Sequence, residues 1–417
     1  MLKSKSPHLL IIATVWPEPQ SSAAGTRMIQ LISLFKQNEW KITVASTSKK
    51  TEFSAHLKAL DIQTAQIEIN SSSFDRFIRK IQPNIVIFDR FIIEEQFGWR
   101  VAEYCPQAIR ILDTEDLHCL RKARRNTVEE GRPFKPKELL QSDIAKREVA
   151  AILRSDLSLI ISDSEMDLLE NLFNIDEALL HYLPFLLQPI PKTTFNNGFG
   201  FNERKHFITV GNFRHAPNRD AIYYLKNKIW PQIHKKLPGA QMHIYGAYPS
   251  AEIGTLHQPA EGFFIKGRAD DAQAVVSRAR ICLAPLRFGA GLKGKLIEAM
   301  QCGTPSITTG IGAEGLNGRL DWPGVIADSA AEFAAAATAL YSDEKKWEKA
   351  QLQGVKIINS RFLKHAFGPA FLERICSLQQ NLQQHRTDNF TGAMLLHHTA
   401  ESTKYKARWI EEKNKWR

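Results

Sequence analysis

The stretch that decides the fold is residues 285–316, PLRFGAGLKGKLIEAMQCGTPSITTGIGAEGL. An apolar run at 281–285 leads into its glycine-rich loop and predicts a strand, residues 293–302 predict a helix, and residues 305–309 predict another strand. Strands that alternate with helices in this way indicate a parallel sheet covered on both faces. Ligands of such sheets bind at the carboxyl ends of the strands, where this loop is expected to lie.

The same alternation extends outward from this segment in both directions. In the C-terminal half we expect a helix over 218–235 and further strands at 205–211, 241–246, 262–267 and 324–328. In the N-terminal half we expect a helix over 26–37 and strands at 8–14, 41–46, 84–89, 108–113 and 158–163. The fold class is therefore α/β, with two Rossmann-like, doubly wound parallel-sheet domains that face a central cleft.

A chain of 417 residues exceeds what one hydrophobic core usually supports, which agrees with two domains. Between them, 186–203 is rich in Pro, Gly, Asn and Thr and predicts a linker. The expected organisation is an N-terminal Rossmann-like domain over 1–190, a C-terminal Rossmann-like domain over 191–360, a helix over 361–383 that packs back toward the first domain, and an appended basic tail over 384–417.

Composition favours an ordinary globular protein in a reducing compartment. Hydrophobic residues make up 43% of the chain and charged residues 24%. The five cysteines form no CxxC pair, and most lie in apolar runs, which is typical of buried free thiols. The apolar run Leu9–Ala13 behind Lys3 and Lys5 imitates a signal peptide, but it is short and lacks a cleavage site, so we interpret it as a buried strand. A cytoplasmic location follows.

The formal net charge of +11 is ambiguous. Basic residues cluster at 121–132 and again in the tail at 404–417. Such clusters are either solvated faces or contacts with anionic lipid, and nucleic acid is disfavoured because no recognised binding motif accompanies them. We expect a peripheral position at the inner face of an anionic membrane, and no nucleic-acid partner.

The glycine-rich loop predicts an anion site. Gly289, Gly291 and Gly294 precede the helix, whose free backbone N–H groups and positive end attract anions, and Lys293 and Lys295 add positive charge there. Glu298 lies one turn beyond Lys295 on the same face, where a carboxylate can accept two sugar hydroxyls. The alternative is a glycine-rich turn with a Lys–Glu surface pair.

Two further strand ends carry candidate ligand-binding residues. Gly211 ends one strand and Arg214 follows it, with a planar side chain that suits a diphosphate. Asn218 in the same segment is expected to be a helix N-cap. Arg268 and Asp270 follow another strand and border a nucleobase site, unless they form a simple turn.

The N-terminal half offers a loop with Gly25 and an acidic cluster. Asp113, Glu115, Asp116 and His118 follow one strand end, where they suit acceptor binding or proton transfer. One alternative is that the cluster caps the following helix, with Asp116 as the N-cap. Another is a metal site formed by Asp113, Asp116 and His118.

Residues 204–316 resemble the donor-binding half of group 1 glycosyltransferases, which are retaining enzymes of GT-B architecture. The resemblance rests on GNFRHAPNRDA, RFGAGLKGKLIEAMQCGTPSITT and GAEGL. It implies a nucleotide-diphosphate sugar as co-substrate, a lipid-linked or polysaccharide acceptor, and neither a cofactor nor a metal ion. It also implies roles at the following positions: Arg214, Lys293 and Lys295 at the diphosphate, Glu298 at the ribose, Arg268 near the base, Gly25 near the transferred group, and Gly211 and Gly291 in the donor loops.

One departure from the family pattern leaves the chemistry open. Many members carry a second glutamate where this chain has Ala290, which puts the donor-sugar contacts and retention in question. We expect Asp113, His118 and Lys295 to act in catalysis. The alternatives are a sugar-nucleotide 2-epimerase of the same architecture, which needs no acceptor, and a non-catalytic protein that binds nucleotide sugars.

Overall fold

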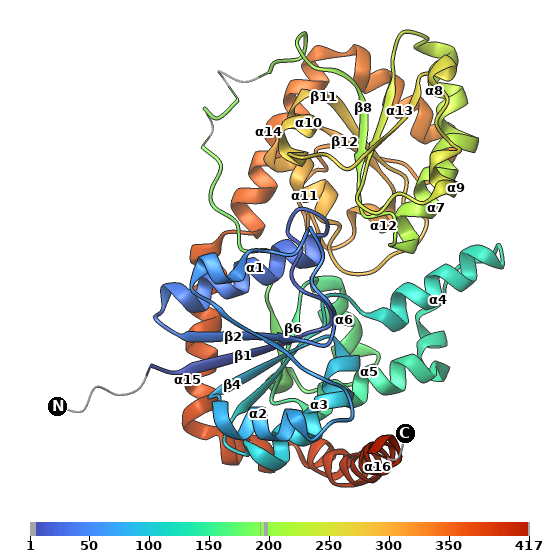
Figure 1. Cartoon of the computed structure of the whole chain (residues 1–417). Coiled ribbons are helices and arrows are strands. Elements are labelled where there is room, and N and C mark those ends of the chain that lie inside the picture. Colours follow the sequence, from blue (N-terminus) through green and yellow to red (C-terminus); the bar gives the residue numbers. More distant parts are fainter. Residues whose placement is uncertain (1–5, 192, 196–198, 416–417) are drawn as a thin grey trace.

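The computed structural model describes residues 6–191, 193–195 and 199–415 (Figure 1). The expected linker residues 192 and 196–198, together with Lys3, Lys5 and Arg417, lie outside the described residues. Two parallel sheets of seven and six strands form the core of the molecule, so the predicted α/β class with two doubly wound sheets is confirmed.

The N-terminal sheet has the strand order β3-β2-β1-β4-β5-β6-β7, and every neighbouring pair is parallel. Its strands are β1 (His8–Ala13), β2 (Lys41–Ser46), β3 (Gln63–Gln66), β4 (Ile85–Asp89), β5 (Ile109–Asp113), β6 (Leu157–Ile160) and β7 (Leu180–Tyr182). The two edge strands were not expected, because β3 has the polar sequence QTAQ and β7 is only three residues long. Neither gives the continuous apolar run that marks a buried strand.

The C-terminal sheet has the order β10-β9-β8-β11-β12-β13, again with parallel neighbours throughout. Its strands are β8 (Lys205–Val210), β9 (Met242–Tyr245), β10 (Phe263–Gly267), β11 (Ala279–Ala284), β12 (Ser306–Thr308) and β13 (Gly324–Ile326). In both sheets the order reverses at one point, between β1 and β4 and between β8 and β11. Ligands of doubly wound sheets bind at such reversal points.

Helices cover both sheets and connect the strands (Figure 1). Those of the N-terminal half are α1 (Ala23–Gln37), α2 (Ser73–Ile81), α3 (Phe91–Tyr104), α4 (His118–Glu129), α5 (Asp143–Arg154) and α6 (Asp163–Asn171). Those that follow are α7 (Ala216–Tyr224), α8 (Trp230–Lys236), α9 (Ala251–Gly254), α10 (Ala272–Arg278), α11 (Gly294–Gln301), α12 (Gly310–Ala313), α13 (Ala330–Ser342), α14 (Glu344–Arg361), α15 (Lys364–Asp388) and α16 (Phe390–Lys415).

Two expected helix caps are wrong. Asn218 lies inside α7, which begins at Ala216, and its side-chain amide donates to the Asn212 carbonyl at 3.0 Å. Asp116 does not cap α4, because the N-cap position is Leu117. The Glu148 carboxylate of α5 instead accepts the first backbone N–H groups of α4, those of His118 at 2.8 Å and Cys119 at 2.9 Å. Asp116 pairs with Arg121 and lies 3.5 Å from His118.

The chain returns to its first half after α14. Leu187 and Phe362 are joined by a backbone hydrogen bond of 2.7 Å, where the two crossings between the halves run side by side. α15 then packs on the N-terminal sheet and its helices, with Phe371 against Phe35 at a ring distance of 6.0 Å. α16 follows and lies against α3 and α5, on the side of this half that faces away from the C-terminal sheet (Figure 1).

Candidate active site

The first part of the candidate site lies in the C-terminal half of the chain and begins where β8 ends. The loop after it is tightly packed, because a Cβ on Gly211 would lie 2.6 Å from the Asn218 amide nitrogen, and one on Gly246 would lie 2.0 Å from the Gly211 carbonyl. Arg214 follows on this loop, is exposed, and stacks its guanidinium over the Tyr248 ring at 3.7 Å. This arrangement places a cation beside the reversal point of the sheet.

The glycine-rich loop is already engaged with the other half of the molecule. Gly291 has φ +61° and donates its backbone N–H to the Glu165 carboxylate at 2.8 Å. A Cβ on Gly291 would lie 2.8 Å from the Cβ of Asp116, so only glycine fits this approach. The sequence predicted a bound anion at this loop. In this conformation the Glu165 carboxylate occupies that position.

Lys293 differs from its expected position. Its ammonium is buried, donates to the Gly291 carbonyl at 2.7 Å and lies 3.9 Å from Glu314. Burial lowers the pKa of Lys293 to about 8, against the favourable charge of Glu314. Lys293 therefore holds the loop together from within and does not face an open diphosphate site.

Lys295, on the first turn of α11, has no ion-pair partner among the described residues. It is half-buried, and among the described residues no hydrogen-bond or ion-pair partner reaches its ammonium. Burial lowers the pKa of Lys295 to about 8, opposed only by the nearby Cys282 thiol. A desolvated lysine without a carboxylate partner binds an anion favourably, because the anion removes the cost of the isolated charge.

Glu298 lies one turn beyond Lys295 on α11 and is also half-buried. Burial raises the pKa of Glu298 to about 7, and the charge of Asp271 raises it further. The charges of both Lys295 and Glu298 act on the Cys282 thiol of β11, which shows that the two side chains lie in one region beside this strand. Lys295 and Glu298 thus lie one turn apart on α11, as their spacing in the sequence predicted.

Arg268 reaches across to the N-terminal half. Its guanidinium donates to the Gln20 side chain at 2.7 Å and lies over the Phe53 ring at 4.6 Å. The Arg268 Nε is buried with no hydrogen-bond partner among the described residues. The side chain therefore lies between the two halves, beside the end of β10.

Further contacts join the two halves around this region. Tyr248 donates to the Glu18 carboxylate at 2.8 and 2.9 Å. Arg124 forms a two-pronged ion pair with Glu314, with both distances 2.6 Å. These contacts hold the two halves against each other, and we call this arrangement closed.

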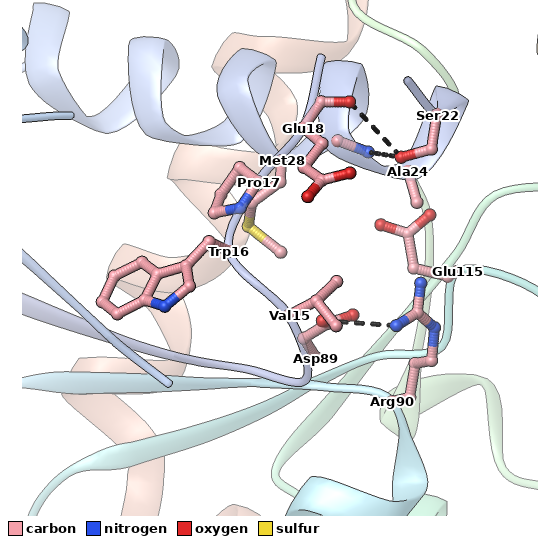
Figure 2. A pocket seen from close by; sticks show the side chains of 11 residues that line it. Val15, Trp16, Pro17, Glu18, Ser22, Ala24, Met28, Asp89, Arg90 and Glu115 are labelled. Carbon is pink, nitrogen blue, oxygen red and sulfur yellow. Dashed lines mark hydrogen bonds and ion pairs between the residues drawn. The ribbon is translucent and has the colours of Figure 1, made fainter. Parts of the chain in front are cut away.

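A pocket lies in the N-terminal half at the reversal point between β1 and β4 (Figure 2). Its cavity volume is about 30 Å³ in this closed arrangement. One side is apolar and the other is charged; the lining residues are Val15, Trp16, Pro17, Glu18, Ser22, Ala24, Gly25, Met28, Asp89, Arg90 and Glu115. Gly25 is required here because a Cβ would lie 2.4 Å from the backbone of Glu18.

Three buried carboxylates lie at this strand edge: Asp89 and Glu115, which line the pocket, and Asp113, which does not. Asp113 has no solvent exposure and is held by Arg27, at 2.9 Å. Burial raises the pKa of Asp113 and of Glu115, and the charge of Asp113 raises that of Glu115 further. One oxygen of each carboxylate is buried and has no hydrogen-bond donor within the described part of the chain. Such oxygens are suited to accept hydroxyl groups of a ligand.

The structure separates the expected pair Asp113 and His118 from the pocket surface. Asp113 is enclosed with Arg27, and neither Asp113 nor His118 lines the pocket. His118 packs edge-on against Phe91 at 5.5 Å, and burial lowers its pKa to about 4, so the ring is neutral at pH 7. Over residues 6–191, 193–195 and 199–415, no group of three or more His, Cys, Asp or Glu is placed to hold a metal ion, so Asp113, Asp116 and His118 do not assemble the alternative metal site.

Sequence reasoning missed Asp89, Arg90, Glu18 and Glu165. Asp89 is the last residue of the strand sequence NIVIFD, and Arg90 follows it. The sequence alone therefore could have placed both residues at the carboxyl edge of the sheet. The other two were not accessible, because their partners Tyr248 and Gly291 are remote in sequence and meet them only through contact between the two halves.

Comparison with known proteins identifies the C-terminal half. Residues 204–343 match the sequence profile of the family described as glycosyl transferases group 1. No curated protein sequence matches the chain significantly. Residues 204–343 are therefore similar in sequence to a group 1 glycosyltransferase domain.

Solved structures match nearly the whole chain in fold. A variant of S. aureus TarM, in complex with fondaparinux, α-GlcNAc-glycerol and UDP, has a TM-score of 0.67 at 9% identity, over 88% of this chain and 99% of that one. Sucrose-phosphate synthase from Thermosynechococcus elongatus has a TM-score of 0.68 at 16% identity, over 90% and 99%. Anabaena HepE in complex with UDP has a TM-score of 0.63 at 11% identity, over 89% and 100%. The chain thus has GT-B architecture.

Proposed function

We propose that this glycosyltransferase moves a sugar from a nucleoside-diphosphate donor to a hydroxyl acceptor, with retention, in the synthesis of a surface glycan or glycolipid. The observation that carries the proposal is the pair Lys295 and Glu298 at the carboxyl edge of the C-terminal sheet, where a desolvated cation without a counter-charge lies one turn from a carboxylate. UDP in complexes of two proteins of similar fold makes a uridine nucleotide the first donor to test.

Lys295 and Arg214 supply the charge that the reaction requires. Cleavage of the bond between the sugar and the diphosphate builds negative charge on the phosphate oxygens. A cation desolvated in advance stabilises that charge more than water would, because it needs no reorganisation when the bond breaks. Arg214 lies on the loop after β8 and is exposed, so its side chain is available to bind phosphate in two-pronged geometry.

Glu298 is assigned to the ribose of the donor. Its carboxylate accepts two hydroxyl hydrogens when it is ionised, and its half-buried position excludes competing water. Hydrogen bonds to a charged group contribute about 1.5–3 kcal/mol each. Arg268 borders the base side of the same region, between the ends of β10 and the Gln20 loop.

The pocket of Figure 2 is the proposed acceptor site. Its unpaired carboxylate oxygens on Asp89 and Glu115 accept hydroxyls, while Trp16, Pro17 and Met28 offer an apolar wall to the face of a sugar ring. The closed arrangement brings Asp116, beside this pocket, against Gly291 of the donor loop. Closure excludes water and so favours transfer over hydrolysis.

For retention we propose attack from the same face as the departing phosphate, with that phosphate taking the proton of the acceptor hydroxyl. The bond from the anomeric carbon to the diphosphate oxygen breaks while the bond to the acceptor oxygen forms on the same side. No protein nucleophile is required by this route. Ala290 leaves the donor sugar without the second carboxylate common in the family, so backbone groups of the loop hold the sugar instead.

We further propose that the reaction takes place at the cytoplasmic face of a membrane. All five cysteines are free and four are buried, as expected in a reducing compartment. No helix within the described ranges is long and apolar enough to cross a membrane. The basic cluster at 121–132 offers little free charge, because Arg121, Arg124, Arg125 and Arg132 each pair with a carboxylate. Attachment therefore needs another surface.

The test is a panel of nucleotide sugars scored by thermal stabilisation of the purified protein, followed by product analysis with the best donor. A ligand at 100 times its Kd stabilises the folded state by about 2.7 kcal/mol, which a melting curve resolves. Transfer to an added sugar acceptor supports the proposal. Conversion of the donor to its 2-epimer without an acceptor, or binding with neither reaction, would refute it.

A further inference from the structure

The C-terminal helix α16 carries an exposed apolar stripe. Phe390, Met394, Tyr405 and Trp409 are 74%, 46%, 65% and 62% exposed, respectively. They follow one another at spacings of four, eleven and four residues. Since eleven residues make about three helical turns, the four side chains project from one face of the helix.

The opposite face of α16 is fixed to the body of the protein. Ala407 is buried there, and Glu411 accepts the backbone N–H of Ser72 at 2.9 Å. Beside the stripe, Lys404 pairs with Glu103 at 2.9 Å. These contacts to α2 and α3 hold the helix on the N-terminal half in one orientation. The apolar stripe is thus held outward by the fold and does not belong to a loose tail.

Positive charge borders the stripe on two elements. On α16 the cations are Lys404, Lys406, Arg408, Lys413 and Lys415, and on α2 they are Arg76, Arg79 and Lys80. The two sets meet at Tyr104, because Arg79 lies over its ring at 4.1 Å and Arg408 interacts with its hydroxyl. Lys404 and Arg408 share the single carboxylate of Glu103. Lys406 and Lys413 have no carboxylate partner in the described part of α16 or its surroundings, and Lys413 lies over the Trp409 ring.

We propose that this α16 surface, the apolar stripe with its bordering cations, binds an anionic lipid bilayer. Tyr and Trp rings favour the boundary between headgroups and acyl chains, and lysine and arginine beside them are attracted to anionic headgroups. The proposal rests on the membrane attachment in the proposed function and names the surface that carries it. It replaces the cluster at 121–132, where four arginines are paired within the protein. On α16, Lys404, Arg408 and Lys415 are also paired, and Lys406 and Lys413 supply the free charge.

This surface has a consequence for orientation. α16 lies at the end of the N-terminal half, remote from α11 and the C-terminal sheet (Figure 1). A bilayer against α16 therefore supports the N-terminal half and leaves the donor half on the aqueous side. The donor half remains free to open and close while the other half stays attached.

The experiment measures binding of the full chain to phosphatidylcholine vesicles with and without phosphatidylserine, by sedimentation and by quenching of tryptophan fluorescence with brominated lipid. We expect binding that requires phosphatidylserine. The variant Tyr405→Ser/Trp409→Ser should lose both sedimentation and quenching. Lys406→Ser and Lys413→Ser should each weaken binding about fivefold, since one cation near an anionic surface contributes about 1 kcal/mol.

Three controls separate this proposal from its alternatives. Leu352→Ser removes a residue that is 52% exposed on α14, in the other half, and should bind vesicles as the parent does. Thermal stabilisation by UDP in the same samples reports the donor site independently, so loss of vesicle binding with UDP stabilisation retained concerns α16 alone. Arg125→Ser/Arg132→Ser tests the earlier cluster and should leave binding unchanged.

Two results would overturn the α16 proposal. One is vesicle binding that survives Tyr405→Ser/Trp409→Ser but falls with Arg125→Ser/Arg132→Ser, which would return attachment to the cluster at 121–132. The other is a lipid-free dimer, seen by light scattering, that the Tyr405→Ser/Trp409→Ser variant converts to monomer. The stripe would then be an interface between two copies of this chain.

Discussion

In the donor site that we propose, Lys295 and Glu298 carry opposite charges that burial disfavours, and this sets the expected pH range of donor binding. Burial lowers the pKa of Lys295 to about 8 and raises that of Glu298 to about 7. A bound diphosphate favours the charged lysine, and ribose hydroxyls favour the charged glutamate. Affinity is therefore lost as the pH falls through about 7 and as it rises through about 8.

The expected result is a bell-shaped profile of nucleoside-diphosphate affinity, measured by calorimetry from acid to alkaline pH. Glu298→Gln should remove the loss of affinity at acid pH, except for the part that comes from titration of the nucleotide itself. Lys295→Met should remove the loss of affinity at alkaline pH. Each limb changes affinity by at most tenfold per pH unit, since one proton is involved. A profile that both variants leave unaltered would mean that other groups bind the nucleotide.

Asp113 and Glu115 are expected to give different losses although they are neighbours. Asp113→Ala leaves Arg27 buried and unpaired, and removal of one partner of a buried pair costs about 3–5 kcal/mol of stability. Chemical denaturation should show this loss, so reduced turnover of Asp113→Ala follows from a damaged fold. Unchanged stability of the Asp113→Ala protein would contradict the buried pair seen here.

Glu115→Ala removes a side chain that faces the pocket. We expect its folded stability to be kept, its acceptor KM to rise about tenfold, as for loss of a hydrogen bond to a carboxyl group, and its nucleotide affinity to stay unchanged. Initial rates against acceptor concentration check this. Glu348→Ala, at an exposed side chain on α14 in the C-terminal half, serves as the control. An unaltered acceptor KM would remove Glu115 from the acceptor site.

At the scale of elements, α11 and its glycine loop form the contact on which closure depends. A Cβ on Gly294 would lie 2.4 Å from the Cβ of Ala23, at the start of α1 in the other half. Alanine suits the first turn of a helix, so Gly294→Ala leaves α11 intact but keeps the two halves apart. Turnover should fall at least tenfold, while the melting temperature and nucleotide affinity stay near those of the parent.

Gly239→Ala is the matched control, because a Cβ there would meet no atom within 4 Å. Both variants can be followed by initial rates and by small-angle scattering in the presence of nucleotide. Parental turnover of Gly294→Ala would show that the closed contact between α11 and α1 is not used in the reaction.

The elements also show how far sequence reasoning reaches. The buried strands and α11 were predicted within about two residues, since continuous apolar runs and glycine loops are local signals. β3 and β7 were missed because one is polar and the other short. The spacing of Lys295 and Glu298 could be predicted because both lie on one helix. The inward turn of Lys293 could not, because it depends on Glu314 and on the contact of Gly291 with Glu165.

The whole molecule is a pair of doubly wound domains closed on each other through charged contacts. Arg124–Glu314, Tyr248–Glu18 and Glu165–Gly291 all join the N-terminal half to the C-terminal half. None of these contacts involves the side chain of Lys295 or Glu298, the two residues that we propose bind the nucleotide. Closure and donor binding are therefore separable, and the donor site can be tested in either arrangement.

The proposed function depends most directly on where the nucleotide binds. Calorimetric titration with UDP tests this, on the parent protein and on the variants Lys295→Ala, Glu298→Ala and Gly239→Ala. Glu298→Ala should weaken binding by about 1.5–3 kcal/mol, the value of hydrogen bonds to a charged group, and Gly239→Ala should not change it. Lys295→Ala should weaken binding less than it lowers turnover, which should fall by about 10²–10³-fold, as for loss of one charge-stabilising donor. Melting curves should show all four proteins folded. Parental UDP affinity in both Lys295→Ala and Glu298→Ala would contradict the account and place the donor site elsewhere.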